Sequence, residues 1–530
     1  MNLGNECDVV IAGGGLAGLS LSLQLKKRYP DFDITVLEQK KHPVPVAAHK
    51  VGESTVEIGG RYLEHTVGLA EHLHQDQLPK FGLRYFFGGD RKPNDMAGYD
   101  ELGTSDFLPV RTFQVDRGIL ENHMLEQARQ SGIDVWDGMS VRSLTLADKG
   151  GRHSVNARTA DREFSFSSRW IVDSTGRQAK IKKHLDLART VDHEICSVWL
   201  RTANKVDIDE LGTGADWRER CGGHSRWLST NHMMGTGYWF WLIPLASGST
   251  SIGLVFDPTI HPVRSVSNMD RLMTWLEEHE PIVAAALEPE RATILDFHLL
   301  RHFAHGSRQL FSADRWALTG EAGLFLDPFY SPGSDFIAIS NTFVTQLIGE
   351  KEPRRKAAFF QRFYLSIFDN TLPVYQHQYP GFGDRDLMTL KTVWDYSYYW
   401  GVLAYLFYTE KLTDIAFLEA AQPQIIKVRA LNTAIQEKFR TLGAMRRQLP
   451  AEGRFIDHYA IGLLSNLKLQ LVEDHTGQEQ TRLAANACML EELASALEAQ
   501  LQSCADGQRL GRVERIRGLE TSGRHLLSAA

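Results

Sequence analysis

The glycine triplet near the start of the chain constrains the fold more than any other feature. Gly13, Gly15 and Gly18 lie between the apolar, strand-like run DVVIA (residues 8–12) and the segment LAGLSLSLQLKKRY, whose apolar residues recur at helical spacing. A second strand-like run, ITVLEQ, follows and contains Glu38. These segments predict a β-α-β unit at the start of an α/β sheet.

The same unit has the features of a dinucleotide-binding site. Glycines permit a tight turn and a close approach of pyrophosphate, the helix N-terminus favours an anion, and an acid about 20 residues later binds the ribose hydroxyls. We therefore expect the cofactor to be bound by Gly13, Gly15, Ala17, Gly18 and Glu38. No second triplet follows a strand later in the sequence, so one dinucleotide is expected.

A segment late in the chain indicates that this dinucleotide is FAD. RWALTGEAGLFLDP (residues 315–328) reads as a strand that runs into a turn of glycines and an acid. In many flavoproteins such a segment meets the ribityl chain and the diphosphate. We expect Glu321 to be the hydrogen-bonding acid there, and the alternative is an exposed carboxylate in a turn.

The rest of the chain predicts two further regions. Residues 190–300 are rich in β-forming and aromatic residues, and residues 351–530 contain apolar positions at helical spacing. The expected fold is therefore α/β, with a Rossmann-like FAD-binding sheet, a second β-rich layer and a helical C-terminal region. The predicted domains are an FAD-binding domain over residues 1–350, with β-rich substrate segments at about 80–112 and 190–300 inside it, and a helical domain over 351–530.

Length and composition argue against several classes of protein. A chain of 530 residues is too long for one core and predicts two to three packed units. A formal net charge of −7 gives no basic field for nucleic acid, and no apolar run is long enough for a membrane segment. The five cysteines include no CxxC pair and the twenty histidines show no metal-ligand spacing, which argues against disulfides and metal. We expect a cytoplasmic enzyme with no metal and no nucleic-acid or membrane partner.

Four further stretches together resemble those of the flavin-dependent halogenases, a family on the FAD-monooxygenase fold. They are KVGEST (50–55), PKFGLRYFF (79–87), the W-x-W-x-I-P match WFWLIP (239–244), and the F-x-x-P-x-x-S-x-G match in FLDPFYSPGSDF (325–336). The tryptophan motif and the lysine of the second stretch carry the specificity, because many flavoproteins share the glycine triplet. The resemblance covers roughly residues 5–345.

The resemblance implies that Lys80 is catalytic. In the family, such a lysine holds or covalently captures the hypohalous acid that forms from reduced FAD, O₂ and halide. Its ammonium can donate a hydrogen bond to the hypohalous oxygen, or its neutral amine can form a haloamine. The second route needs burial, because the ordinary pKa of lysine is about 10.4. The sequence leaves both routes open, and the alternative for Lys80 is a solvated surface lysine.

Further site residues are implied by the same resemblance. In the family, the tryptophans matched by Trp239 and Trp241 wall the flavin from the organic substrate, although their alternation also suits aromatic residues in a sheet core. The implied contacts to the cofactor come from Gly52, Glu53, Ser54 and Arg117. For the arginine, the alternative is a surface charge at the start of a helix.

The loop FLDPFYSPGSDF departs from the family pattern at two positions. Tyr330 stands where tryptophan halogenases carry glutamate, which argues against a tryptophan-type substrate site. Pro332 falls on the first of two positions whose backbone N–H groups bind chloride in the family, and proline has no N–H. We still expect Gly333 and Ser334 to bind halide, with Ser334 also at the cofactor and its hydroxyl able to replace the lost donor. A shifted halide site, a preference for a larger halide and a loss of halogenation remain open.

The resemblance implies a two-component flavin-dependent halogenase. It would use reduced FAD, O₂ and chloride or bromide on an electron-rich phenol, pyrrole or indole, either unattached or tethered to a carrier protein. Reduced FAD would come from a separate flavin reductase, because no NAD(P)H-binding motif is evident. The alternative is an FAD-dependent monooxygenase or dehydrogenase on the same fold that does not use halide. A flavin-binding scaffold without turnover is a third hypothesis.

Overall fold

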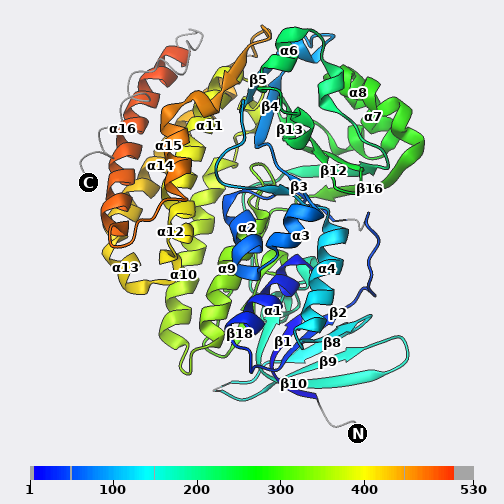
Figure 1. Ribbon diagram of the computed structural model, residues 1–530, viewed down its shortest axis with the longest axis vertical. Helices are drawn as coiled ribbons and strands as arrows, with labels where there is room; N and C mark the ends of the chain where they lie inside the picture. The colour runs from blue at the N-terminus through cyan, green and yellow to red at the C-terminus, as the bar shows by residue number, and fades with distance from the viewer. Residues whose placement is uncertain (1–4, 48–49, 149, 447, 506–530) are drawn as a thin grey trace. The chain divides into compact units, whose positions relative to one another are not determined.

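The computed structural model describes residues 5–47, 50–148, 150–446 and 448–505 of the chain (Figure 1). Two compact units are each assembled from three separated segments. The first unit consists of Met1–Gln77, Val115–Asp192 and Ala304–Phe368, and the second of Leu78–Gln114, His193–Phe303 and Asp369–Ala530. The helical C-terminal region therefore groups with the β-rich segments in one unit. The domain boundaries expected from the sequence, at residues 1–350 and 351–530, stay a prediction.

The first unit is built on a seven-stranded sheet with a parallel centre. The strand order is β7-β2-β1-β10-β9-β8, and β18 pairs in parallel with the C-terminal end of β10. The strands are β1 (Asn5–Ala12), β2 (Ile34–Glu38), β7 (Asp134–Asp137), β8 (Ser140–Thr145), β9 (His153–Arg158), β10 (Glu163–Asp173) and β18 (Trp316–Leu318). Val9, Val10 and Ile11 of β1 have no exposed surface, because a parallel strand is covered on both faces.

Three helices of the first unit follow its parallel strands: α1 (Leu16–Arg28) after β1, α5 (Lys180–His184) after β10 and α9 (Gly333–Ile348) after β18. α1 connects β1 to β2, which gives the β-α-β unit that the sequence predicts. The other helical segments are α2 (Glu57–Arg61), a π-helical turn (Tyr62–Val67), α3 (Ala70–Gln75), α4 (Arg117–Gln130) and α10 (Arg354–Thr371), which begins in this unit. In α/β folds the carboxyl ends of the parallel strands form the edge at which ligands bind.

The second unit is built on an eight-stranded, mostly antiparallel sheet. The strand order is β16-β12-β15-β14-β13-β4-β5-β19, in which β13 pairs with β4 and β5 with β19 in parallel. The strands are β4 (Leu83–Phe87), β5 (Asp100–Gly103), β12 (Cys196–Thr202), β13 (Thr230–Gly235), β14 (Tyr238–Pro244), β15 (Thr250–Phe256), β16 (Ile294–Arg301) and β19 (Phe455–Asp457). The last of these comes from the C-terminal region, so that region contributes a strand as well as helices.

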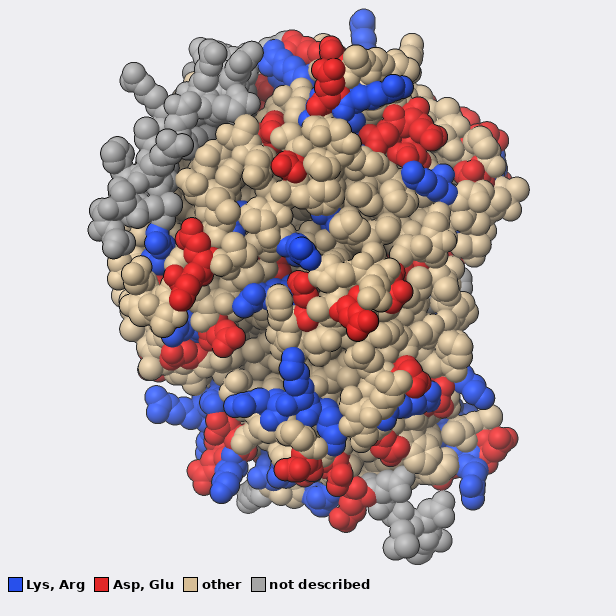
Figure 2. All heavy atoms as spheres, in the orientation of Figure 1, with Lys and Arg blue, Asp and Glu red and all other residues tan. Residues whose placement is uncertain are grey.

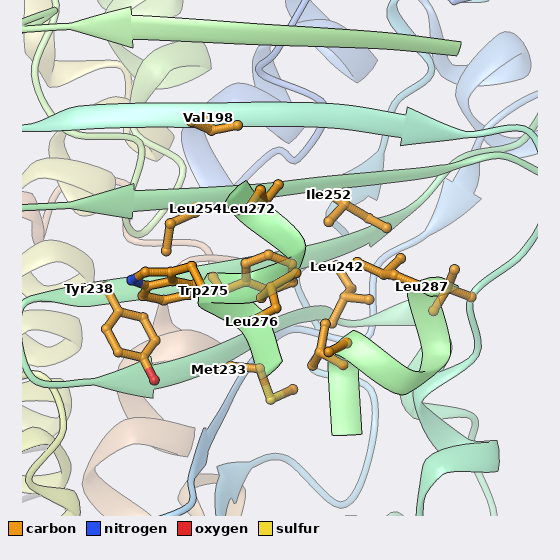
Figure 3. Packing of buried hydrophobic residues seen from close by; sticks show 14 of the residues in the cluster. Val198, Met233, Tyr238, Leu242, Ile252, Leu254, Leu272, Trp275, Leu276 and Leu287 are labelled. Atoms are coloured by element: carbon orange, nitrogen blue, oxygen red, sulfur yellow. The ribbon is translucent and has the colours of Figure 1, made fainter. Parts of the chain in front are cut away.

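One face of this sheet packs on α7 (Met269–His279) and α8 (Pro281–Leu287), as Figure 3 shows. Tyr238, Phe240 and Leu242 of β14 belong to this buried cluster. Because side chains alternate along a strand, the residues between them face the other side of the sheet. That side carries Trp239 and Trp241.

The helices of the C-terminal region are the last part of the second unit. They are α11 (Arg385–Tyr398), a π-helical turn (Tyr399–Ala404), α12 (Tyr405–Tyr408), α13 (Ile415–Ala420), α14 (Gln422–Met445), α15 (Gly462–Gln470) and α16 (Glu479–Ala505). Ion pairs such as Lys438 with Glu498, 3.0 Å apart, connect α14 to α16. The expected fold class is therefore confirmed: a Rossmann-like sheet, a second sheet and a mostly helical C-terminal region.

Surface features complete the description. On the face drawn in Figure 2, lysine and arginine side chains lie among aspartate and glutamate side chains. Within the described part of the chain, none of the helices combines the length and the apolar character needed to cross a membrane.

Candidate functional site

The glycine turn between β1 and α1 is closed on one side and open on the other. Gly13 has a φ of +109°, and a Cβ there would lie 2.3 Å from the carbonyl oxygen of Ser174. A Cβ on Gly18 would lie 1.9 Å from the Gly13 carbonyl oxygen, so neither position tolerates a side chain. Apart from the chain next to it, no described residue lies within 4 Å of the place where a Gly15 Cβ would be. The turn therefore leaves room at the N-terminus of α1, where the helix dipole favours a phosphate.

Glu38 ends β2 beside this turn. Its carboxylate accepts hydrogen bonds from the backbone amides of Gly14 and Lys40, each at 2.7 Å. A Cβ on Gly14 would lie 2.7 Å from the Glu38 Cβ, so the acid packs closely on the turn. The glycines and the acid of the expected dinucleotide site are thus adjacent. The N-terminus of α1 fits a pyrophosphate, and the carboxylate of Glu38 fits the hydroxyl groups of a ribose.

Arg117 begins α4 and makes an ion pair that the sequence reasoning missed. Its guanidinium donates to the carboxylate of Glu121, one turn along the helix, and to the carbonyl oxygen of Val51 at 2.8 Å. Lys50 pairs with the other oxygen of the same carboxylate. Burial alone would raise the pKa of Glu121, but the Arg117 and Lys50 cations hold that pKa below its usual value. Arg117 is therefore fixed by a buried acid and does not behave as a solvated surface charge.

The segment from Gly52 to Ser54 lies against the start of α4. Gly52 has a φ of +91°, and a Cβ there would lie 3.1 Å from Nη1 of Arg117. The carbonyl oxygen of Glu53 accepts a hydrogen bond from the Val115 amide at 2.6 Å. Glu53 and Ser54 are both buried. The structure thus joins two stretches for which the sequence predicts contacts with one cofactor.

Glu321 lies in the turn Gly320–Ala322, just after β18. A Cβ on Gly320 would lie 2.9 Å from the Ala17 methyl group, so this turn packs on the start of α1. The Glu321 carboxylate lies 3.6 Å from Nε of Arg177, and 38% of its side chain is exposed. Glu321 therefore lies near the glycine turn, at the carboxyl ends of the parallel strands, without being enclosed by protein.

The loop FLDPFYSPGSDF forms a tight turn that leads directly into α9. Tyr330 and Ser331 have φ values of +66° and +57°, a left-handed conformation that costs roughly 1–2 kcal/mol for each such residue. The Ser331 amide donates to the carbonyl oxygen of Pro328 at 2.8 Å. Pro332 then takes the N-cap position of α9 with a φ of −75°. The fixed φ of proline suits this position, and no hydrogen bond of the helix is lost there.

The first turn of α9 presents polar groups that the helix itself leaves unpaired. The amides of Gly333 and Ser334 have no acceptor within the helix, because the first four N–H groups of any α-helix lack one. The Ser334 hydroxyl oxygen is buried and has no hydrogen-bond partner among the residues that the structure describes. Gly59 of α2 donates through its amide to Oδ1 of Asp335 at 2.8 Å. These donors fit a small anion at the helix N-terminus.

Lys80 lies in the second unit just after β3 (Leu78–Pro79) and is 4% exposed. Its amide donates to the carbonyl oxygen of Thr112 at 2.9 Å. Burial, and then the charge of Lys80, lower the pKa of His232 to about 3, so this imidazole is neutral at ordinary pH. Nδ1 of His232 lies 3.0 Å from the carbonyl oxygen of Arg84, to which it can donate. Lys80 is therefore an interior side chain near a neutral histidine, which does not fit a solvated surface lysine.

Trp239 and Trp241 lie on the face of β14 that is turned away from α7 and α8. Both are buried, and their ring centroids are 5.6 Å apart. Nε1 of Trp239 donates to the hydroxyl oxygen of Tyr379 at 3.0 Å. The ring centroid of His232 lies 5.4 Å from that of Trp239. The tryptophans and Lys80 thus share His232 as a neighbour.

The expected site residues fall into two groups. The glycine turn, the acids, Arg117 and the donors of α9 belong to the first unit, whereas Lys80 and the tryptophans belong to the second. The sequence reasoning missed three residues that these groups depend on: Lys50, Glu121 and His232. An arginine and a glutamate four residues apart at the start of a helix are a signal that would have found Glu121. Nothing in the sequence around His232 distinguishes it from an ordinary strand residue.

Comparisons with known proteins identify a family and relatives of this chain. A family profile described as FAD binding domain matches residues 6–275. A flavin-dependent halogenase of Dictyostelium discoideum is 24% identical over 438 residues, which cover 76% of this chain and 71% of that protein. A 1H-pyrrole-2-carbonyl peptidyl-carrier-protein chlorinase of Pseudomonas fluorescens is 23% identical over 351 residues, which cover 62% of this chain and 72% of that protein.

Solved structures show a similar fold. The crystal structure of halogenase PltM matches with a TM-score of 0.64 at 18% identity, over 97% of this chain and 99% of that chain. The flavin-dependent halogenase CmlS matches with a TM-score of 0.56 at 20% identity, over 72% of this chain and 66% of that chain. At these identities the match concerns the fold alone.

Proposed function

Since the chain belongs to the FAD binding domain family and is related to flavin-dependent halogenases, it is an FAD-dependent oxidoreductase, and we propose that it halogenates an electron-rich aromatic substrate. The proposed co-substrates are O₂ and chloride or bromide. A separate flavin reductase would supply reduced FAD. The substrate would be a phenol, a pyrrole or an indole, either unattached or tethered to a carrier protein.

In this proposal, residues of the first unit hold the cofactor. The glycine turn and the N-terminus of α1 would bind the diphosphate, Glu38 would accept hydrogen bonds from the ribose, and Arg117 and Glu321 would contact FAD further along. Reduced FAD would supply two electrons and two protons, so that O₂, halide, one further proton and an aromatic C–H give the aryl halide, oxidised FAD and two molecules of water. The protein would position these reactants and exclude competing ones.

The halide would be bound at the N-terminus of α9. The amides of Gly333 and Ser334 point from the positive end of a 16-residue helix, and the buried Ser334 hydroxyl lies on the same turn. Pro332 removes one backbone donor that the family has. The Ser334 hydroxyl would replace it, because a hydroxyl can turn its hydrogen toward an anion.

Lys80 would guide the oxidised halogen to the substrate. As an ammonium it would donate a hydrogen bond to the hypohalous oxygen, and as an amine it would form a haloamine. Trp239 and Trp241 would wall the substrate side so that the aromatic ring meets the halogen at the lysine rather than at the flavin.

The burial of Lys80 carries this proposal: the lysine is 4% exposed and lies near a neutral histidine whose ring is a neighbour of Trp239. The test is to incubate the protein with FAD, a flavin reductase, O₂ and a panel of phenols, pyrroles and indoles, with bromide or chloride either present or omitted. Mass spectrometry should find a product that carries one halogen and forms only with halide. A hydroxylated or desaturated product that forms equally without halide would contradict halogenation.

A second candidate is favoured by Pro332 alone. If the lost donor has abolished halide binding, the chain is an FAD-dependent monooxygenase or dehydrogenase on the same fold. The same experiment decides between the two, because only the halogenase needs halide for its product.

A further inference from the structure

A row of buried aromatic side chains in the second unit runs from His232, which lies near Lys80, to the C-terminal helices. The ring of His232 stacks on that of Tyr85, with centroids 5.0 Å apart. The Tyr85 hydroxyl lies 3.0 Å from the hydroxyl of Tyr396 in α11. The ring of Tyr396 in turn contacts Trp400, at 4.9 Å, and His458, at 5.6 Å. The row therefore links the eight-stranded sheet to residues of the C-terminal region.

The far end of this row holds polar atoms without partners. Within the described residues, both ring nitrogens of His458 and Nε1 of Trp400 are buried and have no hydrogen bond. The hydroxyl of Thr392, one turn before Tyr396 on the same side of α11, is in the same state. Such atoms are rare, because each buried polar group that lacks a partner costs roughly 1–3 kcal/mol. Their grouping around one tyrosine therefore calls for a bound partner.

The chemistry of these atoms selects the partner. Burial, followed by the charges of Lys468 and Arg84, lowers the pKa of His458 to about 3, so its imidazole is neutral. A neutral imidazole offers one donor and one acceptor, and the indole N–H of Trp400 offers a donor. A phenolic hydroxyl both donates and accepts, so it can donate to the acceptor nitrogen of His458 and accept from the N–H of Trp400, whereas the single N–H of a pyrrole or an indole can only donate. A carboxylate would leave the acceptor of His458 unpaired.

The backbone at Trp400 also points to a binding site. Trp400 lies in the π-helical turn Tyr399–Ala404, which interrupts the run from α11 to α12. Such turns are less stable than α-helix and occur frequently at functional sites. The ammonium of Lys468, in α15, lies 4.8 Å from the centroid of the Trp400 ring. This cation–π contact helps to hold the ring in place.

We propose that His458 and Trp400 form the site that recognises the hydroxyl group of a phenolic substrate, with Tyr396 as an aromatic wall. This inference rests on the proposed function and narrows its substrate class to phenols. It assigns the C-terminal region a role in substrate selection, and it makes His458 and Trp400 specificity-determining residues.

The test is a binding measurement that involves neither halide nor O₂. Isothermal titration of the FAD-loaded full chain with 1,3-dihydroxybenzene is compared with titration by 1,3-dimethoxybenzene, which has the same ring and cannot donate. The wild-type protein should bind the diol at least about 10-fold more tightly than the diether. His458→Phe should remove most of that preference, while the affinity for the diether changes little.

Trp400→Phe is the second variant, because it keeps an aromatic ring and deletes only the N–H. It should weaken binding of the diol by about 3- to 10-fold, and it keeps the proposal testable if His458→Phe does not fold. His475→Phe is the matched control: this histidine is also buried against a tyrosine, but its Nε2 lies 2.7 Å from the carbonyl oxygen of Gln470. The control should retain the preference for the diol.

Two results would overturn the inference: equal affinities of the wild-type protein for the diol and the diether, including no binding of either, or an unchanged preference in both His458→Phe and Trp400→Phe. Failure here is separate from failure of halogenation. A chain that binds phenols through His458 but makes no halogenated product would refute only the proposed function, and the reverse result would refute only the inference.

Discussion

Gly59 and Ser334 approach so closely that a Cβ on Gly59 would lie 2.2 Å from the Ser334 hydroxyl oxygen and 2.7 Å from its Cβ. The Gly59 amide also donates to Asp335 at the next position. α2 therefore contacts the first turn of α9 through a residue that has no room for a side chain. The position of the proposed halide donors depends on this contact.

The first prediction concerns that contact. Gly59→Ala should lower the free energy of unfolding by about 1–3 kcal/mol, because the added methyl group must push α2 and α9 apart. The KM for halide should rise at the same time. Denaturant unfolding and steady-state kinetics measure the two effects.

A second substitution and a control sharpen this test. Adding Ser334→Gly should recover stability in the Gly59→Ala background, since it removes the atoms that clash, without recovering halide affinity. Gly462→Ala, at the start of α15 where no described atom lies within 4 Å, should be neutral or slightly stabilising. A Gly59→Ala protein as stable as the wild type would show that the contact is not rigid.

The second prediction concerns Pro332. Pro332→Ala adds an N–H at the N-cap of α9, and its φ of −75° is one that alanine also adopts. A hydrogen bond to a charged partner contributes roughly 1.5–3 kcal/mol, so the KM for halide should fall by about 10-fold or more. Steady-state kinetics at varied bromide and chloride concentrations measure this change.

The matched control is Pro353→Ala, because Pro353 precedes α10 and its carbonyl oxygen also accepts from the first turn of the helix that follows. It should leave the KM for halide unchanged. If Pro332→Ala leaves it unchanged too, the halide does not bind at the N-terminus of α9.

The third prediction concerns pH. The pKa of Glu121 would be raised by burial but is lowered below 4.5 by Arg117 and Lys50. A group with a lowered folded-state pKa adds stability above its unfolded pKa, and that stability is lost as the pH falls through the lower folded value. The wild-type protein should therefore lose stability as the pH falls below about 4.5.

Glu121→Gln removes this contribution and leaves two cations without their buried partner. Its unfolding free energy at neutral pH should be lower by about 3 kcal/mol, and it should depend less on pH in the acid range. Glu126→Gln, on the exposed side of the same helix, is the control. Its unfolding free energy should depend on pH in the acid range as that of the wild-type protein does. Parallel wild-type and Glu121→Gln curves over the acid range would refute the assignment. Chemical denaturation at a series of pH values provides the curves.

Much of the fold could be predicted because local patterns determine it. The apolar run of β1, the glycine turn and the helical spacing after it act within about 30 residues, and they give β1, α1 and β2 as expected. β19 could not be predicted, since three residues at 455–457 form a strand only because β5, far away in the sequence, offers its edge.

The candidate site also contains residues that local sequence patterns predict and residues that they do not. Glu38 and the glycines lie where motif spacing places them, and Pro332 proves to be a helix cap, which its neighbours in sequence could not reveal. His458 carries no signal in the sequence because its environment is made by Tyr396 and Lys468, which come from other elements. Side chains whose chemistry depends on burial and long-range partners are therefore the ones that sequence reasoning missed.

The most direct test of the account is whether Lys80 is required for halogenation but not for oxidation of the flavin. The measurement is the amount of brominated product formed for each reduced FAD oxidised, by mass spectrometry and absorbance, in the wild-type protein and in Lys80→Ala and Lys205→Ala. Lys205, a half-exposed lysine of the same unit, is the control. We predict that Lys80→Ala oxidises reduced FAD at a similar rate and forms no brominated product, while the control matches the wild type. Bromination that persists in Lys80→Ala at the wild-type ratio would contradict the account.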